Sequence, residues 1–125
     1  TIAGGFCNDI QTREKIGRAW RDHRYLIDTH TAVAYHVLDE YRCETGDAAP
    51  AVVVSTASPF KFCDQVLRGI GGTADAFGPE LIRRLTCETQ IDAPAPLTGL
   101  DARPVRFGGC VDRTQMLHTV DEFLK

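Results

Sequence analysis

Several protein classes are excluded by what the sequence lacks. Its formal net charge is −3, and no stretch combines clustered Lys and Arg with interleaved aromatics as nucleic-acid-binding surfaces do. No apolar run approaches the length of a membrane span, and no basic-then-apolar segment marks a signal peptide. We therefore expect a cytoplasmic globular protein with no nucleic-acid or membrane partner.

Cysteine is present, but not in a pattern that indicates disulfides or metal binding. The five cysteines are widely spaced, odd in number and free of any C-x-x-C pair: Cys7, Cys43, Cys63, Cys87 and Cys110. Such spacing favours reduced thiols in the cytoplasm over a disulfide framework or a zinc site. No metal site is predicted.

Methionine is almost absent. The chain starts at Thr1, and its one methionine is Met116. We therefore expect a piece of a longer protein, cut either by natural processing or at an artificial boundary. The 125 residues suffice for one domain and not for two, which predicts a single domain over residues 1–125.

The catalytic signatures that a sequence can reveal are absent as well. Gly69, Gly71 and Gly72 follow a predicted helix rather than a strand, so they indicate the end of a helix and not a phosphate-binding loop. Cys63 lies one turn into a helix, where the dipole lowers a thiol pKa, but no base is recognisable beside it. No Ser/His/Asp or Cys/His triad is found. The sequence predicts no catalytic residue within this chain.

What the chain does contain is an unusual run from Ala51 to Phe62. Its β-branched start shows no polar alternation, which is typical of a strand covered on both faces, usually in a parallel sheet. A buried helical segment is the alternative, but the run is short and β-branched. Ser58 and Pro59 then provide a helix start. We expect a buried, parallel-type strand at about residues 51–56.

Capping signals predict helices on both sides of this strand. Asn8 and Gln11 resemble a capping box for a helix that ends at residues 22–24. Asp28 or Thr29 begins a second helix that ends near Gly46. Its buried stripe is expected at Val33, His36, Val37 and Tyr41.

Three further helices are predicted towards the carboxyl end. Two of them span residues 59–70 and 79–86, and a proline-rich connector follows at 91–104. The last helix has a capping-box pair, Asp112 and Gln115, and a hydrophobic staple between Val111 and Met116. Its apolar face comprises Leu117, Val120, Phe123 and Leu124.

The number of strands conflicts with this picture. Besides residues 51–56, only residues 104–107 resemble a short strand, yet a buried strand requires hydrogen-bonding neighbours. The neighbours come either from another copy of the chain or from sequence outside it, and we favour the latter. The predicted fold class is therefore α/β, a mostly helical fragment of a larger domain.

Four polar residues are candidates for binding a ligand. Ser55 and Thr56 lie at the carboxyl end of the strand, where open α/β sheets place their ligands. Lys61 adds positive charge near a helix amino terminus, and His30 lies in the first turn of the second helix. Each also has a purely structural interpretation: backbone hydrogen bonds for the hydroxyls, a solvated lysine, and a histidine in a cap.

Two motifs resemble one enzyme family. Residues 28–35, Asp-Thr-His-Thr-Ala-Val-Ala-Tyr, are similar to a segment near the end of threonine synthases. Residues 55–62, Ser-Thr-Ala-Ser-Pro-Phe-Lys-Phe, resemble that family's Thr-Ala-His/Ser-Pro-x-Lys-Phe motif. Gly5-Phe6 and residues 104–125 are also similar to family members, so the resemblance covers the carboxyl-terminal portion of the enzyme. Thr29 replaces the usual proline, and Ser58 the commoner histidine.

The resemblance implies a pyridoxal 5'-phosphate enzyme of fold type II, a lyase that converts O-phospho-L-homoserine and water to L-threonine and phosphate. It implies that Thr56 hydrogen-bonds the pyridine nitrogen, with Ser55 as a second cofactor contact and Lys61 and His30 near the substrate. The Schiff-base lysine and the phosphate loop lie upstream in such enzymes. No counterpart is found at Lys15, Lys61 or Lys125. We therefore expect the isolated chain to be inactive and to bind no cofactor.

Two hypotheses remain at this point. The first is a carboxyl-terminal fragment of threonine synthase, and the second is a stand-alone α/β interaction module without catalysis. We favour the fragment, because an unpaired central strand does not suit an independent module. Its exposed edges would also allow the fragment to self-associate.

Overall fold

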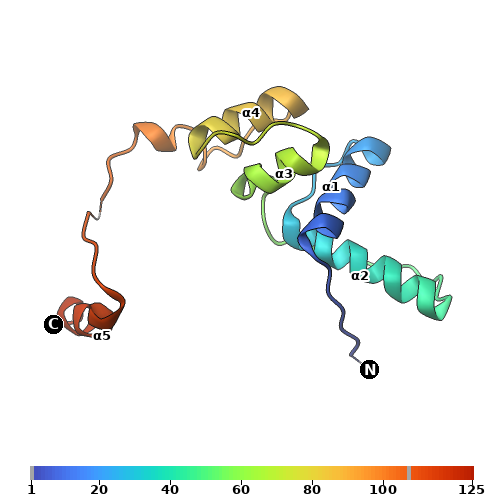
Figure 1. Cartoon of the computed structure of the whole chain (residues 1–125), viewed down its shortest axis with the longest axis horizontal. Helices are drawn as coiled ribbons and strands as arrows, with labels where there is room; N and C mark the ends of the chain where they lie inside the picture. Colours follow the sequence, from blue (N-terminus) through green and yellow to red (C-terminus); the bar gives the residue numbers. More distant parts are fainter. Residues whose placement is uncertain (1, 107) are drawn as a thin grey trace.

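The computed structural model describes residues 2–106 and 108–125. Helix α1 (Asp9–His23) contacts both α2 (Thr29–Thr45) and α3 (Cys63–Ile70), and α3 contacts α4 (Pro79–Thr89). Figure 1 shows these helices packed together, while α5 (Met116–Phe123) lies apart from them. Three 3₁₀ turns complete the described elements: η1 (Pro59–Lys61), η2 (Leu100–Ala102) and η3 (Arg113–Gln115).

Local capping chemistry sets the limits of α1. Asn8 accepts from the backbone N–H of Gln11 at 3.0 Å, and Gln11 accepts from the N–H of Asn8 at 2.9 Å. This reciprocal pair satisfies two donors that the first turn of a helix otherwise leaves unpaired. The helix ends where Arg24 adopts a left-handed conformation with φ of 51°. The predicted capping box and helix end are confirmed.

Helix α2 begins and ends as predicted, but it buries a different face. Asp28 is the N-cap, and Gly46 ends the helix with φ of 70°, which glycine adopts without a steric penalty. Of the expected buried stripe, Val33, His36 and Val37 are only half-buried and Tyr41 is exposed, whereas the buried residues of the helix are Thr31 and Ala32. Helix α2 packs against α1 as far as Asp39, which pairs with Lys15, and its carboxyl-terminal end projects from the bundle (Figure 1).

The helix predicted from Pro59 is divided in two. Residues Pro59–Lys61 form the 3₁₀ turn η1, and the α-helix proper starts at Cys63 after a break at Phe62, whose φ is −130°. Gly71 ends α3 with φ of 89°, as the glycine pair predicts. Helix α4 runs to Thr89, three residues beyond the predicted end.

The core lies where α1, α3 and α4 meet. Its largest fully buried apolar side chains are Ile16, Val66, Leu67 and Leu85. The crossing of α1 and α3 depends on two glycines. A methyl group on Gly17 would overlap the carbonyl oxygen of Gly69, and one on Gly69 would lie 2.9 Å from Ile16 Cγ2. The backbones of α1 and α3 are therefore in direct contact at Gly17 and Gly69, with no side chain between them.

The predicted α/β fold class is wrong for the described residues, which are helical and contain no strand or sheet. Residues 51–56 are extended but unpaired, with Val52 90% and Val54 69% exposed. The physical reason is that a strand needs neighbours to complete its hydrogen bonds, and the described chain offers none. The uninterrupted apolar residues of this segment predicted burial on both faces, which the described residues do not provide.

The second predicted strand, residues 104–107, is also not seen. Residues 104–106 belong to no strand, and residue 107 lies outside the described residues. This short apolar segment has no parallel or antiparallel neighbour within the described parts of the chain.

Helix α5 has the expected apolar face without a covering element. Asp112 accepts from the N–H of Thr114 at 3.2 Å and so caps η3, rather than forming the predicted side-chain exchange with Gln115. Leu117 is 75% and Phe123 84% exposed. The apolar spacing was predicted correctly, but none of the helix's residues is buried among the described residues.

Candidate functional site

The four candidate residues lie in three separate surface depressions or beside them. His30 lines a depression formed by the first turns of α1, α2 and α3. Lys61, in η1, lines a second one against α4, and Ser55 lines a third together with Ala19 of α1. Thr56 is exposed, and its hydroxyl makes no hydrogen bond to any described residue. No two of the candidates line the same depression.

A fifth residue, Asp28, brings two of the candidates together. Its side chain is fully buried. Oδ1 lies 3.1 Å from Nδ1 of His30, and Oδ2 accepts from the Thr31 hydroxyl and lies 3.5 Å from Ser55 Oγ. We call Asp28, His30, Thr31 and Ser55 the Asp28 cluster. It joins residues that lie more than twenty positions apart in the sequence.

The cluster follows from the local structure of α2. As N-cap, Asp28 accepts from the backbone N–H groups of His30 at 2.9 Å and Thr31 at 3.5 Å. A helix amino terminus carries partial positive charge, so a carboxylate is the favoured cap. The same turn places the side chains of His30 and Thr31 beside the carboxylate.

Two opposing effects act on the Asp28 carboxyl. Burial raises its pKa, whereas hydrogen bonds from the Thr31 hydroxyl, from the His30 backbone and ring, and from the Thr31 backbone lower it. The hydrogen bonds prevail, and the pKa of Asp28 lies below its usual value. The carboxylate is therefore ionised at neutral pH and acts only as an acceptor.

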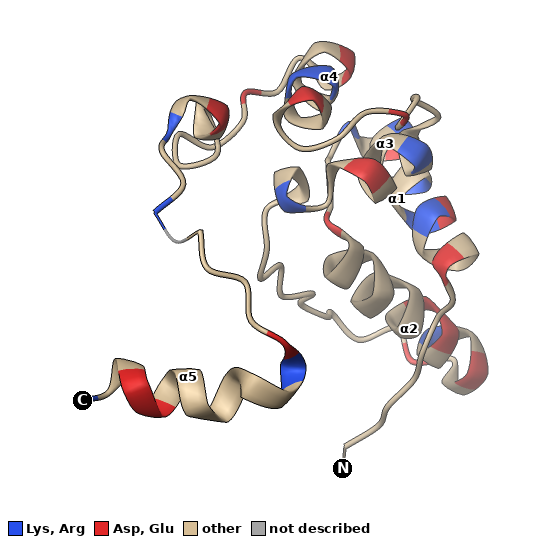
Figure 2. Ribbon diagram, turned by 60° about the vertical axis from the view of Figure 1, so that its left-hand side comes forward, with Lys and Arg blue, Asp and Glu red and all other residues tan. Residues whose placement is uncertain are grey.

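The link to the extended segment runs through two hydroxyls. Thr31 Oγ1 and Ser55 Oγ are 2.9 Å apart and hydrogen-bonded. This contact fixes the residue directly before Thr56 against the first turn of α2. Figure 2 shows two stretches without Lys, Arg, Asp or Glu: the first part of α2, residues 29–38, and the segment that leads to Thr56, residues 48–56. The Thr56 hydroxyl is thus presented from an otherwise uncharged segment.

His30 is held on a second side by an aromatic ring. The ring of Phe62 lies edge-on to the imidazole, with centroids 5.0 Å apart and planes at 62°. The His30 side chain is nevertheless 64% exposed. Its ring therefore has a fixed orientation and free access from the depression that it shares with Cys7, Thr12 and Thr29.

The lysines do not offer a site for a cofactor imine. Lys15 is 7% exposed, forms an ion pair with Asp39, and lies with its ammonium 4.5 Å from the centroid of the Tyr35 ring. A Schiff-base lysine must reach its carbonyl as a free amine, which this pairing opposes. Lys61 is exposed in η1, away from Thr56's neighbour Ser55 and its depression.

Cys63 is structural rather than reactive. Burial, together with the charge of neighbouring Asp64, raises the pKa of its thiol to about 11. The Sγ atom donates to the carbonyl of Phe60 at 3.1 Å. These contacts oppose thiolate formation and outweigh the dipole at the start of α3.

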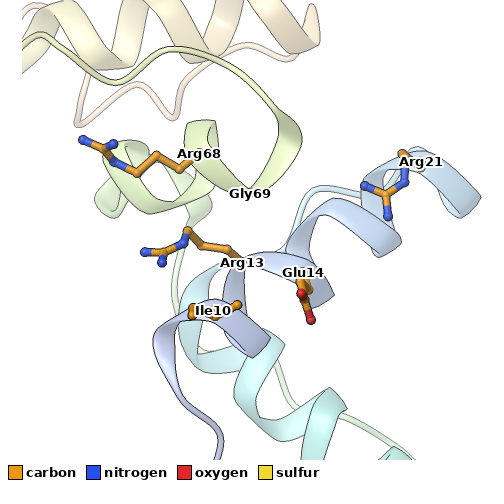
Figure 3. A pocket seen from close by; sticks show the side chains of 6 residues that line it. All are labelled: Ile10, Arg13, Glu14, Arg21, Arg68 and Gly69. Atoms are coloured by element: carbon orange, nitrogen blue, oxygen red, sulfur yellow. The ribbon is translucent and has the colours of Figure 1, made fainter.

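Three arginines surround a depression at the crossing of α1 and α3, as Figure 3 shows: Arg13, Arg21 and Arg68. Arg13 donates to Gln65 at 3.0 Å, and Arg68 donates to the carbonyl of Ala74 at 3.1 Å. Glu14 contributes a carboxylate to the same depression. Two of the guanidinium groups therefore already have partners within the fold.

Residues 2–106 and 108–125 contain neither a metal site nor a membrane-spanning helix. No group of three His, Cys, Asp or Glu side chains there is arranged to hold a metal ion. No helix in this part of the chain is long and apolar enough to cross a membrane.

Sequence reasoning missed the role of Asp28 beyond capping. The helix start identified Asp28 as a cap candidate, and His30 two residues later as a ligand candidate. Nothing local indicated that Ser55 would lie beside the same carboxylate. An Asp-x-His-Thr sequence at a helix start is the signal that could have suggested a shared carboxylate.

Comparison with protein families shows where the chain belongs. A family model described as "Threonine synthase, C-terminal" matches residues 31–122. The matched region includes Thr31, Ser55, Thr56 and Lys61 and extends into α5. No curated protein matches the chain.

Proposed function

Because the chain belongs to the threonine synthase C-terminal family, we propose that it is the carboxyl-terminal part of a pyridoxal-phosphate-dependent threonine synthase. The observation that carries this proposal is the match over residues 31–122, which includes both motifs except for the first three residues of the earlier one. The reaction proposed for the complete enzyme is the conversion of O-phospho-L-homoserine and water to L-threonine and phosphate, in the cytoplasm.

Among the described residues, Thr56 suits a contact with the pyridine nitrogen of the cofactor, whereas no lysine is assigned to an imine. Thr56 carries an exposed hydroxyl without a partner among the described residues, which suits a hydrogen bond to the pyridine nitrogen. Bound pyridoxal phosphate supplies an electron sink, and a neutral hydroxyl leaves its ring nitrogen less protonated than a carboxylate would. Lys15 is buried and paired, so no imine is assigned to it, and no reaction step is assigned to this chain.

The roles of the other candidates follow from where they lie. Ser55 is engaged with Thr31, so we propose that it orients Thr56 rather than contacting the cofactor itself. His30 is accessible and fixed, which supports a contact with the substrate. Lys61 lines a different depression from His30, so Lys61 can contact the substrate only if the substrate extends to η1.

The decisive experiment uses the protein encoded by the complete reading frame. Thr56→Val removes the hydroxyl while retaining the shape of the side chain, and loss of one hydrogen bond of about 1.4 kcal/mol weakens cofactor binding about tenfold. Thr73→Val is the matched control, since Thr73 is also exposed. Release of phosphate from O-phospho-L-homoserine and cofactor affinity are measured together.

Two outcomes would contradict the proposal. Absence of phosphate release from O-phospho-L-homoserine by the complete wild-type protein would exclude threonine synthase activity. Equal cofactor affinity in Thr56→Val and Thr73→Val would exclude the assigned contact, even if the reaction proceeds.

A further inference from the structure

The Asp28 cluster determines on which ring nitrogen neutral His30 carries its proton. Asp28 Oδ1 lies 3.1 Å from His30 Nδ1, and the same oxygen accepts from the backbone N–H of His30 at 2.9 Å. An ionised carboxylate has no proton to donate. A hydrogen bond between these two groups therefore requires the proton on Nδ1.

The neighbours of this nitrogen do not oppose that arrangement. Thr29 Oγ1 lies 3.5 Å from Nδ1 and, as a hydroxyl, accepts as well as it donates. The second carboxylate oxygen is occupied by the Thr31 hydroxyl, with Ser55 at 3.5 Å. Asp28 Oδ1 and Thr29 Oγ1, the two atoms beside Nδ1, can both accept a hydrogen bond, so nothing in the cluster favours an unprotonated Nδ1.

We propose that Asp28 is a positioning residue, which holds neutral His30 with its ring proton on Nδ1 and presents Nε2 as a hydrogen-bond acceptor at the depression between α1, α2 and α3. The nitrogen bound to a partner decides the state of the other one, as in histidines oriented by a carboxylate. The Phe62 ring, 5.0 Å from the imidazole, fixes the plane in which Nε2 is presented.

This arrangement selects the chemistry of what His30 binds. An unprotonated Nε2 accepts from a donor such as an ammonium group, a hydroxyl or a water molecule. It cannot donate to a phosphate oxygen unless the ring is protonated. In the proposed function, neutral His30 thus faces a water molecule rather than the phosphate of the substrate. The choice of that donor rests on the proposed function, whereas the tautomer does not.

The same carboxylate also acts on the segment before Thr56. Through Thr31 and Ser55, whose hydroxyl oxygens are 2.9 Å apart, it holds the end of the extended segment against α2. His30 and the neighbour of Thr56 are therefore positioned by one buried group. A change at Asp28 is expected to affect both, and a change at Ser55 only the second.

The test is long-range ¹H–¹⁵N NMR of the ¹⁵N-labelled chain without cofactor, at a pH where histidine is neutral. His30→Gln assigns the His30 signals by their disappearance. In the wild-type chain, we expect the nitrogen shift of a protonated Nδ1 and an unprotonated Nε2. The opposite pattern in the wild-type chain would overturn the proposal without any variant of Asp28.

Variants then show whether Asp28 is responsible. Asp28→Ser retains an N-cap side chain but is too short to reach the ring, so we expect the proton to move towards Nε2. Asp9→Ser is the matched control, because Asp9 lines the same depression without bonding to His30. Ser55→Ala is expected to keep the tautomer and to shift the backbone amide resonance of Thr56.

The two proposals fail separately. An unchanged tautomer in Asp28→Ser, with helical structure retained by circular dichroism, would overturn the role of Asp28 and leave the enzyme assignment standing. Absence of threonine synthase activity in the complete protein would contradict the proposed function, but the proposal about the His30 tautomer would still stand.

Discussion

Replacing Asp28 by alanine is expected to destabilise the chain far more than replacing it by asparagine. Alanine removes the N-cap of α2 and both carboxylate oxygens of the Asp28 cluster at once. Asparagine retains one oxygen for the backbone N–H groups but loses the charge, and its NH2 group replaces the oxygen that accepts from the Thr31 hydroxyl. The two substitutions therefore separate the cap from the rest of the cluster.

The magnitude follows from the contacts. Loss of an N-cap costs about 1 kcal/mol in the free energy of unfolding. The buried Thr31 hydroxyl loses its carboxylate partner but can still donate to Ser55, so its penalty falls at the lower end of the ~1–3 kcal/mol for an unpaired buried group. The exposed His30 ring is solvated and adds little. Asp28→Ala should cost about 2–3 kcal/mol, and Asp28→Asn about 1 kcal/mol or less.

The pH dependence provides an independent check. Since the pKa of Asp28 is lower in the folded than in the unfolded chain, its charge stabilises the fold fully above the unfolded value of about 4. That stabilisation is lost as the pH falls through the lower folded value. The difference in stability between wild type and Asp28→Asn should thus be largest at neutral pH and shrink below pH ~4.

The assay is urea unfolding followed by far-ultraviolet circular dichroism between neutral and acidic pH. With an m-value of about 2 kcal/mol/M, a loss of about 2–3 kcal/mol in Asp28→Ala lowers the midpoint by about 1–1.5 M. Equal losses for alanine and asparagine, or a difference between wild type and Asp28→Asn that grows as the pH falls below ~4, would refute the reasoning.

Three shorter predictions concern other parts of the chain. Gly17→Ala should destabilise the fold by about 1–3 kcal/mol in urea unfolding, because the added methyl overlaps the Gly69 carbonyl, while Gly4→Ala, with open space around it, should be neutral. Cys63 should react with a disulfide reagent at pH ~8 much more slowly than exposed Cys43, since burial and Asp64 raise its pKa to about 11. The 125-residue chain mixed with pyridoxal phosphate and borohydride should show no stoichiometric adduct on a single lysine by mass spectrometry, because buried Lys15 is paired with Asp39.

Local signals in the sequence predicted the helices well. The Asn8–Gln11 capping box, the Asp28 cap and the glycine at position 46 each act within one turn of the backbone, so their effect is visible in the sequence itself. The family resemblance carried by residues 28–35 and 55–62 is likewise confirmed by the match over residues 31–122.

Long-range packing could not be predicted in the same way. The apolar run at 51–56 indicated a buried strand, but burial depends on neighbours that the described chain does not contain, and Val52 is 90% exposed. The face that α2 buries also depends on where α1 meets it, so that Thr31 is buried and Tyr41 is exposed. The bond from Thr31 to Ser55 spans 24 positions, so no local pattern indicates it.

The central claim is that the segment leading to Thr56 is held against α2 through the Asp28 cluster. A double-mutant cycle of Thr31→Val and Ser55→Ala, measured by urea unfolding, tests it most directly. The 2.9 Å contact between the two hydroxyls predicts a coupling energy of about 0.5–1.5 kcal/mol. Losses that add within ~0.3 kcal/mol would show that the two residues do not interact and would contradict the account.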